Sequence, residues 1–405
     1  MGVYLDHQAT SPMTDEVKQA YREALDVVGN PSSIHQAGQR ARAVLEDARE
    51  RIAAVIDAEP VEVVLTSGGT EAINAALKGA LWAAQKADLS NPGAIVATQA
   101  EHHATLDALA WLVSRGATWL APGVDEFGVM NTAELDSLLE SHPVAVVSTL
   151  VANNEVGSLQ PVDQIVEIAR AHQVATHVDA VAALGYIPVS FRDLGTTAMS
   201  ISAHKVGGPV GVGALVLSRH APAWEALHHG GEQQRQRSGT LNVAGAVGFA
   251  VALEAREAKR QQGVRALALL RDRLMLGLQA EVQGIVVRGS TERLPGNLHI
   301  TVPGCEGDVL LYLLDQHGIH VSTGSACQAG VAEASHVLLA MGVSEPDARG
   351  ALRFSLSYST TEADVDQVIS VFASVVERAS AAGMAAPAQA RGIVFRADGG
   401  GLYLH

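Results

Sequence analysis

A lysine and a carboxylate follow two neighbouring predicted strands, and together they fit one kind of cofactor chemistry. Lys205 comes shortly after the apolar run 198–202 and is trailed by glycines, while Asp179 closes an earlier apolar run, 175–179. A lysine can hold pyridoxal phosphate (PLP) as a Schiff base. A carboxylate keeps the pyridine nitrogen protonated, so that the ring can accept electrons. The two residues therefore predict a PLP site.

The turn 67–71, Ser-Gly-Gly-Thr-Glu, joins a predicted strand to a predicted helix and could receive the phosphate of that cofactor. Free N–H groups at a helix start attract anions, and glycines let a phosphate approach the backbone. No Gly-Lys-Ser/Thr follows, so the turn is not a Walker A motif. Because such turns often contain glycine for steric reasons alone, the segment gains weight only beside Lys205 and Asp179.

Three further polar segments follow predicted elements and could contact a flat ring or its substituents. His102 could stack on the ring and exchange protons near neutral pH, or it could form only a helix-start hydrogen bond. The segment 153–157, Asn-Asn-Glu-Val-Gly, could bind a cofactor hydroxyl or could be a simple turn. The basic loop 235–240 could reach a phosphate in its own subunit or a neighbour's, or it could be solvated. The histidines show no recognised ligand spacing, so we expect no metal.

The chain has two cysteines, Cys305 and Cys327, and only the second lies in a loop of small residues, 322–330. This setting favours a reactive thiol at Cys327, which must be ionised to attack. We expect Cys305 to be an inert buried residue. Two cysteines form neither a disulfide framework nor a thiolate metal site. Arg353 could clamp a substrate carboxylate bidentately or could form a structural ion pair.

Strands and helices alternate through the middle of the chain, which indicates an α/β fold with a mainly parallel sheet between helices. Ligands gather at the carboxyl ends of the strands in such sheets. A long helix is predicted over 243–281, with a weak point at Gly263, and a smaller α+β region follows it. The predicted strands are 61–66, 94–98, 144–150, 175–179, 198–202 and 213–217, and the predicted helices include 71–85, 105–114, 161–172 and 308–317.

The composition is that of a folded protein with a large core, since 48% of the residues are hydrophobic and 18% are charged. The formal net charge of −15 disfavours a general nucleic-acid binder, which would show a basic stripe. No signal peptide and no run of membrane-spanning length is visible in the sequence. We therefore expect a cytoplasmic protein that binds neither membranes nor nucleic acid directly.

Six ordered segments closely resemble the NifS/IscS-like cysteine desulfurases, PLP enzymes of the class V aminotransferase family and of fold type I. The resemblance extends from Tyr4 to about residue 380. It implies a large domain with a mainly parallel seven-stranded sheet, residues 14–257. It also implies a smaller α+β domain that carries the cysteine loop, residues 1–13 and 258–380. The matching segments are 29–33, 66–71, 153–157, 204–205, 237–240 and 325–327.

The resemblance also implies a role for each candidate residue in converting L-cysteine to L-alanine. Sulfur would remain as a persulfide on the nucleophile Cys327, until a sulfur-acceptor protein of iron–sulfur cluster assembly or tRNA thiolation takes it. We expect a homodimer. Lys205 would hold PLP and move the Cα proton, Asp179 would pair with the pyridine nitrogen, and His102 would stack on the ring as acid/base; Gly69, Thr70, Ser202, His204 and the partner-supplied Thr240 would hold the phosphate, Asn154 would contact the ring hydroxyl side, and Asn30 and Arg353 would hold the substrate carboxylate.

One departure leaves alternatives open. The family usually has a glutamine three residues after the aspartate, where it bonds the ring hydroxyl, but here that residue is Ala182. Losing one such hydrogen bond costs roughly 0.5–1.5 kcal/mol, so cofactor binding should survive while rate or substrate choice could change. A selenocysteine or cysteine-sulfinate lyase, an aminotransferase and a non-enzymatic PLP-binding scaffold are the alternatives. The sequence names neither the acceptor nor a role for the linker and tail, residues 381–405.

Overall fold

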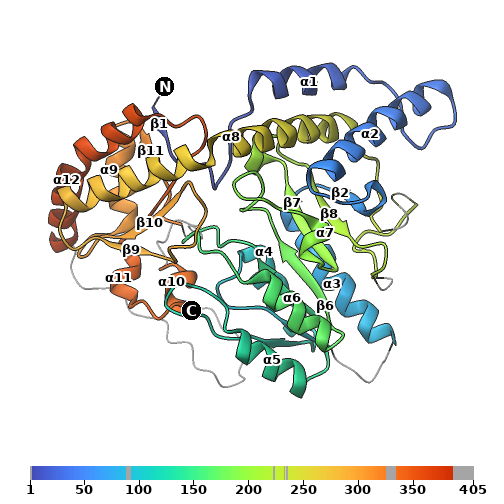
Figure 1. Ribbon diagram of the computed structural model, residues 1–405, viewed down its shortest axis with the longest axis horizontal. Helices are drawn as coiled ribbons and strands as arrows, with labels where there is room; N and C mark the ends of the chain where they lie inside the picture. The colour runs from blue at the N-terminus through green and yellow to red at the C-terminus, as the bar shows by residue number, and fades with distance from the viewer. Residues whose placement is uncertain are drawn as a thin grey trace, which may run out of the picture.

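A seven-stranded sheet, covered by helices on both faces, forms the larger part of the computed structural model, which describes residues 2–87, 93–221, 224–231, 233, 236–324 and 334–385 (Figure 1). The strand order is β2-β8-β7-β6-β5-β3-β4. Only β8 runs antiparallel to its neighbours, so the predicted mainly parallel sheet is confirmed. The strands are β2 (Val63–Thr66), β3 (Ala94–Val96), β4 (Thr118–Leu120), β5 (Val144–Leu150), β6 (Ala175–Asp179), β7 (Ala198–Ser202) and β8 (Gly213–Leu217).

Successive residues of the central strands point to opposite faces of this sheet, as the β pleat requires. In β5, Val146 packs into the apolar cluster beneath α3 (Gly69–Ala87) and α4 (His103–Val113). Val147 joins another cluster on the opposite face. Both faces are therefore apolar, which leaves the strand ends as the places where polar chemistry is available. Covering the sheet as well are α2 (Gln36–Val55), α5 (Thr132–Ser141), α6 (Val162–Ala171) and α7 (Phe191–Leu194).

The smaller sheets bring the N-terminal residues beside strands from the last quarter of the described chain. β1 (Val3–Tyr4) pairs in parallel with β11 (Ile319–His320). A second sheet has the order β12-β10-β9, in which all pairs are antiparallel. Its strands are β9 (Val286–Arg288), β10 (Asn297–Thr301) and β12 (Ala351–Ser355), and the helices near it are α9 (Gly307–Gln316), α10 (His336–Ala340), α11 (Glu345–Arg349) and α12 (Glu362–Ala385).

The long helix α8 (Val243–Glu281) connects these parts, running from beside α1 (Asp15–Leu25) and α2 to beside α12 (Figure 1). It is continuous, so the predicted weak point at Gly263 does not interrupt it. A side chain at Gly263 would lie 3.2 Å from the Tyr358 ring, which explains why the smallest residue stands there. Within the described residues, no helix is long and apolar enough to span a membrane.

Several predicted element ends differ from the structure by one or two residues, and β4 was not predicted. The strand predicted over 61–66 begins only at Val63, because residues 60–62 form a 3₁₀ turn that starts with Pro60. Helix α12 reaches Ala385, so the first residues of the segment predicted as a linker are helical.

Candidate active site

Lys205 and Asp179 meet at one cavity, because their strands are neighbours in the sheet. β6 and β7 are parallel and adjacent, with Asp179 opposite Ser200. Lys205 lies in the short 3₁₀ turn that follows β7, and Gly207 ends this turn with a φ of 84°. A cavity of about 290 Å³ is lined by both Asp179 and Lys205. It lies at the carboxyl ends of the strands, as predicted.

The enclosed position of Lys205 makes its amine a better base than a free lysine. Burial and the nearby Arg353 cation lower the pKa of Lys205 to about 8, while Asp179 and Asp6 oppose the shift. Its Nζ donates a hydrogen bond to the backbone carbonyl of Gln8. A substantial fraction of the amine is therefore neutral near pH 7–8, as Schiff-base formation and proton abstraction require.

Two buried carboxyl groups, those of Glu101 and Asp179, interact electrostatically near the ends of β5 and β6. Burial raises the pKa of Asp179 to about 6, against the N–H of Val181, which donates to Oδ1 at 2.8 Å, and the charge of Lys205. Burial and the Asp179 charge also raise the pKa of Glu101 well above its ordinary value. Both shifts favour the protonated carboxyl, and Asp179, which lines the cavity, is the carboxyl that would pair with a protonated pyridine nitrogen.

The residues predicted to hold the phosphate, which we call the phosphate cup, lie together at the start of α3 and along the cavity. The cavity is lined by Gly69, Thr70, Ser202 and His204, and first-turn N–H groups have no acceptor within their own helix. The hydroxyl of Ser202 is buried and has no hydrogen-bond partner among the described residues. A side chain at Gly68 (φ 153°) would come within 3.9 Å of that hydroxyl. An unpartnered donor beside glycine backbone at a helix start fits a bound phosphate.

His102 lines the same cavity and is the N-cap of α4, so it makes the helix-start hydrogen bond, while its role beside the cofactor ring stays a prediction. Its Nδ1 accepts a hydrogen bond from the N–H of Ala104 at 3.0 Å, which leaves the proton of the neutral ring on Nε2. Burial, then the charge of Lys205, lowers the pKa of His102 to about 4. The ring is therefore neutral at physiological pH.

The adjacent residues Asn153 and Asn154 have different tasks. The Asn153 side chain is buried and holds the turn together, donating to Ala100 O at 2.9 Å and accepting from the N–H of Glu155 at 2.8 Å. Asn154 lines the cavity. Its backbone carbonyl accepts a hydrogen bond from the Arg353 guanidinium at 3.0 Å. The turn is thus both structural and part of the site.

Arg353 bonds Asn154 of the cavity lining. The sequence left two roles open for it, a structural ion pair and a clamp for the substrate carboxylate. One terminal nitrogen donates to Asp6 at 2.7 Å, which is the structural ion pair. Its Nε is buried without a partner among the described residues, so a donor remains for a substrate carboxylate.

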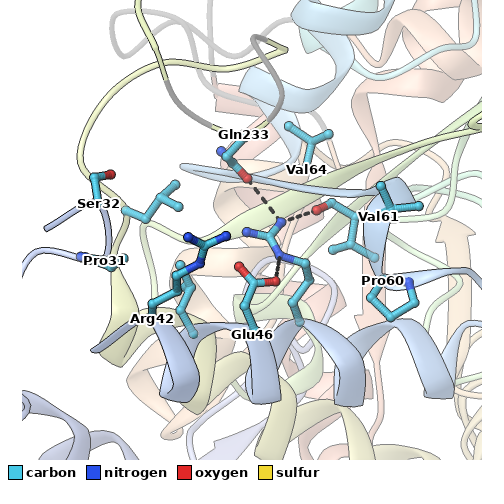
Figure 2. A pocket seen from close by; sticks show the side chains of 12 residues that line it. Pro31, Ser32, Arg42, Glu46, Pro60, Val61, Val64 and Gln233 are labelled. Atoms are coloured by element: carbon cyan, nitrogen blue, oxygen red, sulfur yellow. Dashed lines mark hydrogen bonds and ion pairs between the residues drawn. The ribbon is translucent and has the colours of Figure 1, made fainter. Parts of the chain in front are cut away.

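Thr240 does not line this cavity, unlike the other predicted cofactor-binding residues, and neither does Asn30, which was predicted to bind the substrate carboxylate. Both are exposed, and each is next in sequence to residues that line a second cavity, of about 610 Å³ (Figure 2). In this second cavity, Arg49 bonds Glu46 at 3.1 Å and Gln233 at 3.3 Å. A single subunit therefore leaves two of the predicted roles unfilled.

The basic loop 235–240 is partly accounted for by an ion pair rather than by a phosphate. Arg237 binds Glu71 through two nitrogens, at 2.8 and 3.2 Å. Although burial raises it, the pKa of Glu71 falls to about 2 because of its bonds from Arg237 and Ser67. Arg235 lies outside the described residues.

Cys327 also lies outside the described residues, but both ends of its segment are described. On one side, Ser322 exchanges two backbone hydrogen bonds with Arg353. On the other, the hydroxyl of Ser335 donates to the buried Glu155 at 2.5 Å. Arg353 bonds the carbonyl of Asn154, which lines the cavity, and Glu155 follows Asn154 in the sequence. The sequence analysis treated Glu155 only as part of a turn. The feature that could have singled it out is that it is a carboxylate beside two amide side chains.

Two further expectations concern residues away from the cavity. Cys305 is buried, as predicted, and its Sγ is 3.2 Å from the hydroxyl of Ser380. His177 is a core histidine, bonded to Ser148 at 2.9 Å and to Ser200 at 2.8 Å. No group of three metal-ligating side chains occurs in the part of the chain that the structure describes.

The sheet, the lysine and carboxylate at its strand ends, and the glycine-rich cup define a PLP-dependent enzyme of fold type I. Comparison with known proteins agrees. The model of the family "Aminotransferase class-V" matches residues 3–368. An IscS-like cysteine desulfurase of Mycobacterium tuberculosis is 45% identical over 96% of this chain and 100% of its own length. The cysteine desulfurase IscS of Dictyoglomus turgidum is 37% identical over 93% of this chain and 95% of its own.

Solved structures give the same result. A NifS-like protein superposes with a TM-score of 0.85 at 34% identity, over 93% of this chain and 100% of the other. SspA in complex with cysteine superposes with a TM-score of 0.75 at 28% identity, over 88% of this chain and 99% of the other. The chain therefore belongs to the class-V aminotransferase family, among its IscS/NifS-like cysteine desulfurases. The predicted fold class, enzyme class, PLP cofactor and desulfurase function are confirmed.

Proposed function

We propose that this chain converts L-cysteine to L-alanine and leaves the sulfur as a persulfide on Cys327. The observation that most supports this proposal is that one cavity is lined by Lys205, Asp179, His102 and the residues of the phosphate cup. In the overall step, the Cβ–S bond of the substrate breaks and an S–S bond to Cys327 forms. The proton of the Cys327 thiol balances the hydrogen that alanine gains at Cβ.

When bound, PLP withdraws electrons from the Cα of an attached amino acid, which makes its proton acidic. Lys205, with a pKa lowered to about 8 by burial and Arg353, supplies the amine that takes this proton and later returns one. Asp179 would pair with the ring nitrogen of the bound cofactor, and the unpartnered Nε of Arg353 would bind the substrate carboxylate. The neutral His102, which carries its proton on Nε2, would stack on the ring and donate a hydrogen bond from that atom.

The contacts on either side of Cys327 support its role as nucleophile. Ser322 bonds Arg353, whose guanidinium bonds Asn154 of the cavity lining. Ser335 bonds Glu155, the residue after Asn154. A side chain at Gly324 would lie 3.2 Å from Glu155 Oε2. The described residues on both sides of Cys327 are therefore linked to the turn that contains Asn154.

The test compares Cys327→Ser with the matched variant Cys305→Ser. We expect Cys327→Ser to keep the visible cofactor band and its change on addition of cysteine, but to lose alanine formation by at least about a hundredfold. Cys305→Ser should retain activity, because Cys305 is buried away from the cavity. The measurement is alanine released per PLP. Comparable alanine formation by Cys327→Ser would contradict the persulfide step.

Ala182 favours a second candidate of the same class, in which selenocysteine or cysteine sulfinate is the preferred substrate. Ala182 lines the cavity and offers no donor to the ring hydroxyl. Alanine release from cysteine, selenocysteine and cysteine sulfinate, compared by kcat/KM, decides between them. Pyruvate-dependent amino transfer would instead identify an aminotransferase. No turnover with an acceptor protein and a reductant present would indicate a non-enzymatic scaffold.

We also propose a homodimer, with Thr240 completing the phosphate site of the partner subunit. Thr240 is exposed and does not line the cavity of its own subunit, and the next residue, Leu241, lines the second cavity (Figure 2). Size-exclusion chromatography of the holoenzyme at decreasing concentration tests this proposal. A monomer that retains full PLP and full activity would contradict it.

The remaining proposals concern the division of the chain and its setting. The domain boundaries proposed are 14–257 for the large domain, with 1–13 and 258–380 for the small one. The pairing of β1 with β11 supports assigning the N-terminus to the small domain. We further propose a cytoplasmic enzyme that transfers sulfur to an acceptor protein of iron–sulfur cluster assembly or tRNA thiolation.

A further inference from the structure

Behind the turn that carries Lys205, the chain buries an arginine without a carboxylate. Arg256, on α8, is 6% exposed and forms no ion pair with any described residue. Its guanidinium donates to Ser357 at 2.6 Å and to Ser11 at 2.9 Å. Its Nε is buried with no partner in the described chain. Burying a cation is costly when neither an anion nor a full set of hydrogen bonds compensates it.

Two aromatic rings partly stabilise this cation. The guanidinium carbon lies 4.9 Å from the centroid of the Tyr186 ring and 5.4 Å from that of Tyr358. A terminal nitrogen also donates to the backbone carbonyl of Lys205 at 3.2 Å. Arg256 is thus joined to the cofactor lysine from the side opposite the catalytic cavity.

A separate cavity of about 190 Å³ opens on this cluster. Lys259, one turn further along α8, lines it and forms no ion pair within the described residues. None of the described residues that line the cavity is acidic, although the chain as a whole has a net charge of −15. The polar remainder of the lining consists of hydroxyl donors and one histidine: Ser11, Thr14, Ser357, Tyr358, Ser359 and His7.

We propose that this cavity binds a small tetrahedral oxyanion of the phosphate or sulfate type, held by Arg256, Lys259 and the surrounding hydroxyls. Two cations and several O–H donors match an acceptor-only ligand. His7 adds no charge, because burial and the Arg256 cation lower its pKa to about 4. The volume equals that of roughly six water molecules, which admits such an anion but falls below the ~300 Å³ at which drug-sized ligands begin.

The occupant would lie against the back of the cofactor turn. Val206 and Gly207, the residues after Lys205, line the cavity. Because Arg256 also holds the carbonyl of Lys205, an anion that attracts the guanidinium should change the surroundings of the lysine. This inference is independent of the proposed persulfide chemistry, since it depends only on the described groups behind the turn.

The test uses the holoenzyme, so that PLP fills its own phosphate cup. Inorganic phosphate is titrated and followed by phosphorus NMR, in which the cofactor phosphate gives a separate signal. Sulfate is then added as a competitor, with chloride at equal ionic strength as the reference. The variant is Lys259→Met, which changes an exposed side chain and should not unfold the protein. Its control is Lys18→Met, at an exposed lysine on α1 that pairs only with Asp15.

We expect saturable phosphate binding that sulfate displaces and chloride does not. Lys259→Met should weaken it about tenfold, because one charge-assisted hydrogen bond is lost. Ser359→Ala should weaken it about threefold, and Lys18→Met should leave it unchanged. Equal binding by the Lys259 and Lys18 variants would overturn the proposal, as would phosphate binding that appears only after PLP is removed. Absence of saturable phosphate binding to the holoenzyme would likewise overturn it.

Discussion

The two sides of the Lys205 turn both bury a charge, but they stabilise it in different ways. On the catalytic side, Asp179 is buried and its pKa rises to about 6. This carboxyl can take up a proton when no cation faces it. On the opposite side, the guanidinium of Arg256 cannot lose its proton, so hydroxyls and two tyrosine rings surround it instead.

The comparison teaches that burying a charged group without an oppositely charged partner has different consequences for a titratable group and for a permanent charge. The catalytic side should show a strong dependence on pH before the cofactor binds, because Asp179 can change its state. The opposite side should be nearly independent of pH and sensitive to anions. The predictions below test this contrast, beginning with the largest expected effect.

Asp179→Asn should produce the largest loss of activity. An amide cannot pair with a protonated pyridine nitrogen, so the ring would accept electrons poorly; we expect kcat to fall about a thousandfold, which is roughly 4 kcal/mol. The measurement is alanine formation at saturating PLP and cysteine. A fall of less than about tenfold would show that Asp179 does not pair with the cofactor.

The same variant tests the pH dependence of the catalytic side in the cofactor-free protein. The folded pKa of Asp179, about 6, lies above its ordinary value of 3.8, so between these pH values the folded protein binds more protons than the unfolded chain. The contribution of Asp179 to the free energy of unfolding is therefore retained below about pH 4 and lost as pH rises through 6, by roughly 3 kcal/mol. Urea unfolding at both pH values should show this loss in the parent and not in Asp179→Asn.

Arg256→Met should have a smaller effect, and one that does not depend on pH. The substitution keeps much of the apolar volume but leaves the Lys205 carbonyl and two serine hydroxyls without their donor. We expect the free energy of unfolding to fall by about 2–4 kcal/mol, equally at pH 7 and pH 8, above the range in which the neighbouring His7 titrates. Arg265→Met, at an exposed arginine on the same helix, is the control. A loss that changes with pH would break the contrast between the two sides.

Ala182→Gln should have the smallest effect, on the catalytic side. It restores a donor near the expected ring hydroxyl, so PLP should bind up to about tenfold more tightly, or roughly 0.5–1.5 kcal/mol. The pH at which the visible band of the bound cofactor changes should also shift. Ala182→Leu adds similar bulk without a donor and separates the two causes. Tighter binding in both variants would attribute the gain to packing.

Local patterns were sufficient for four strands of the central sheet, but they missed β4 and misplaced an end of β2 and of β3. The strands predicted over 144–150, 175–179, 198–202 and 213–217 agree with the structure residue for residue. Their apolar runs are bounded by turn residues, and both faces of the sheet are buried, so a continuous run is the expected signal. The start of β2 was predicted too early, because Pro60 imposes a turn that an apolar pattern alone does not reveal.

The sequence by itself determined the chemistry of this protein: a lysine, a carboxylate and a glycine turn, each at the end of a strand, and hence PLP. It could do so because those signals are local and follow the order of the chain. Only the tertiary structure decided which groups share a cavity and which charges lack a partner. Arg256 meets Ser11, Ser357 and the Lys205 turn from segments up to 245 residues apart. No local pattern encodes such a meeting, because packing of the long helix against both ends of the chain creates it.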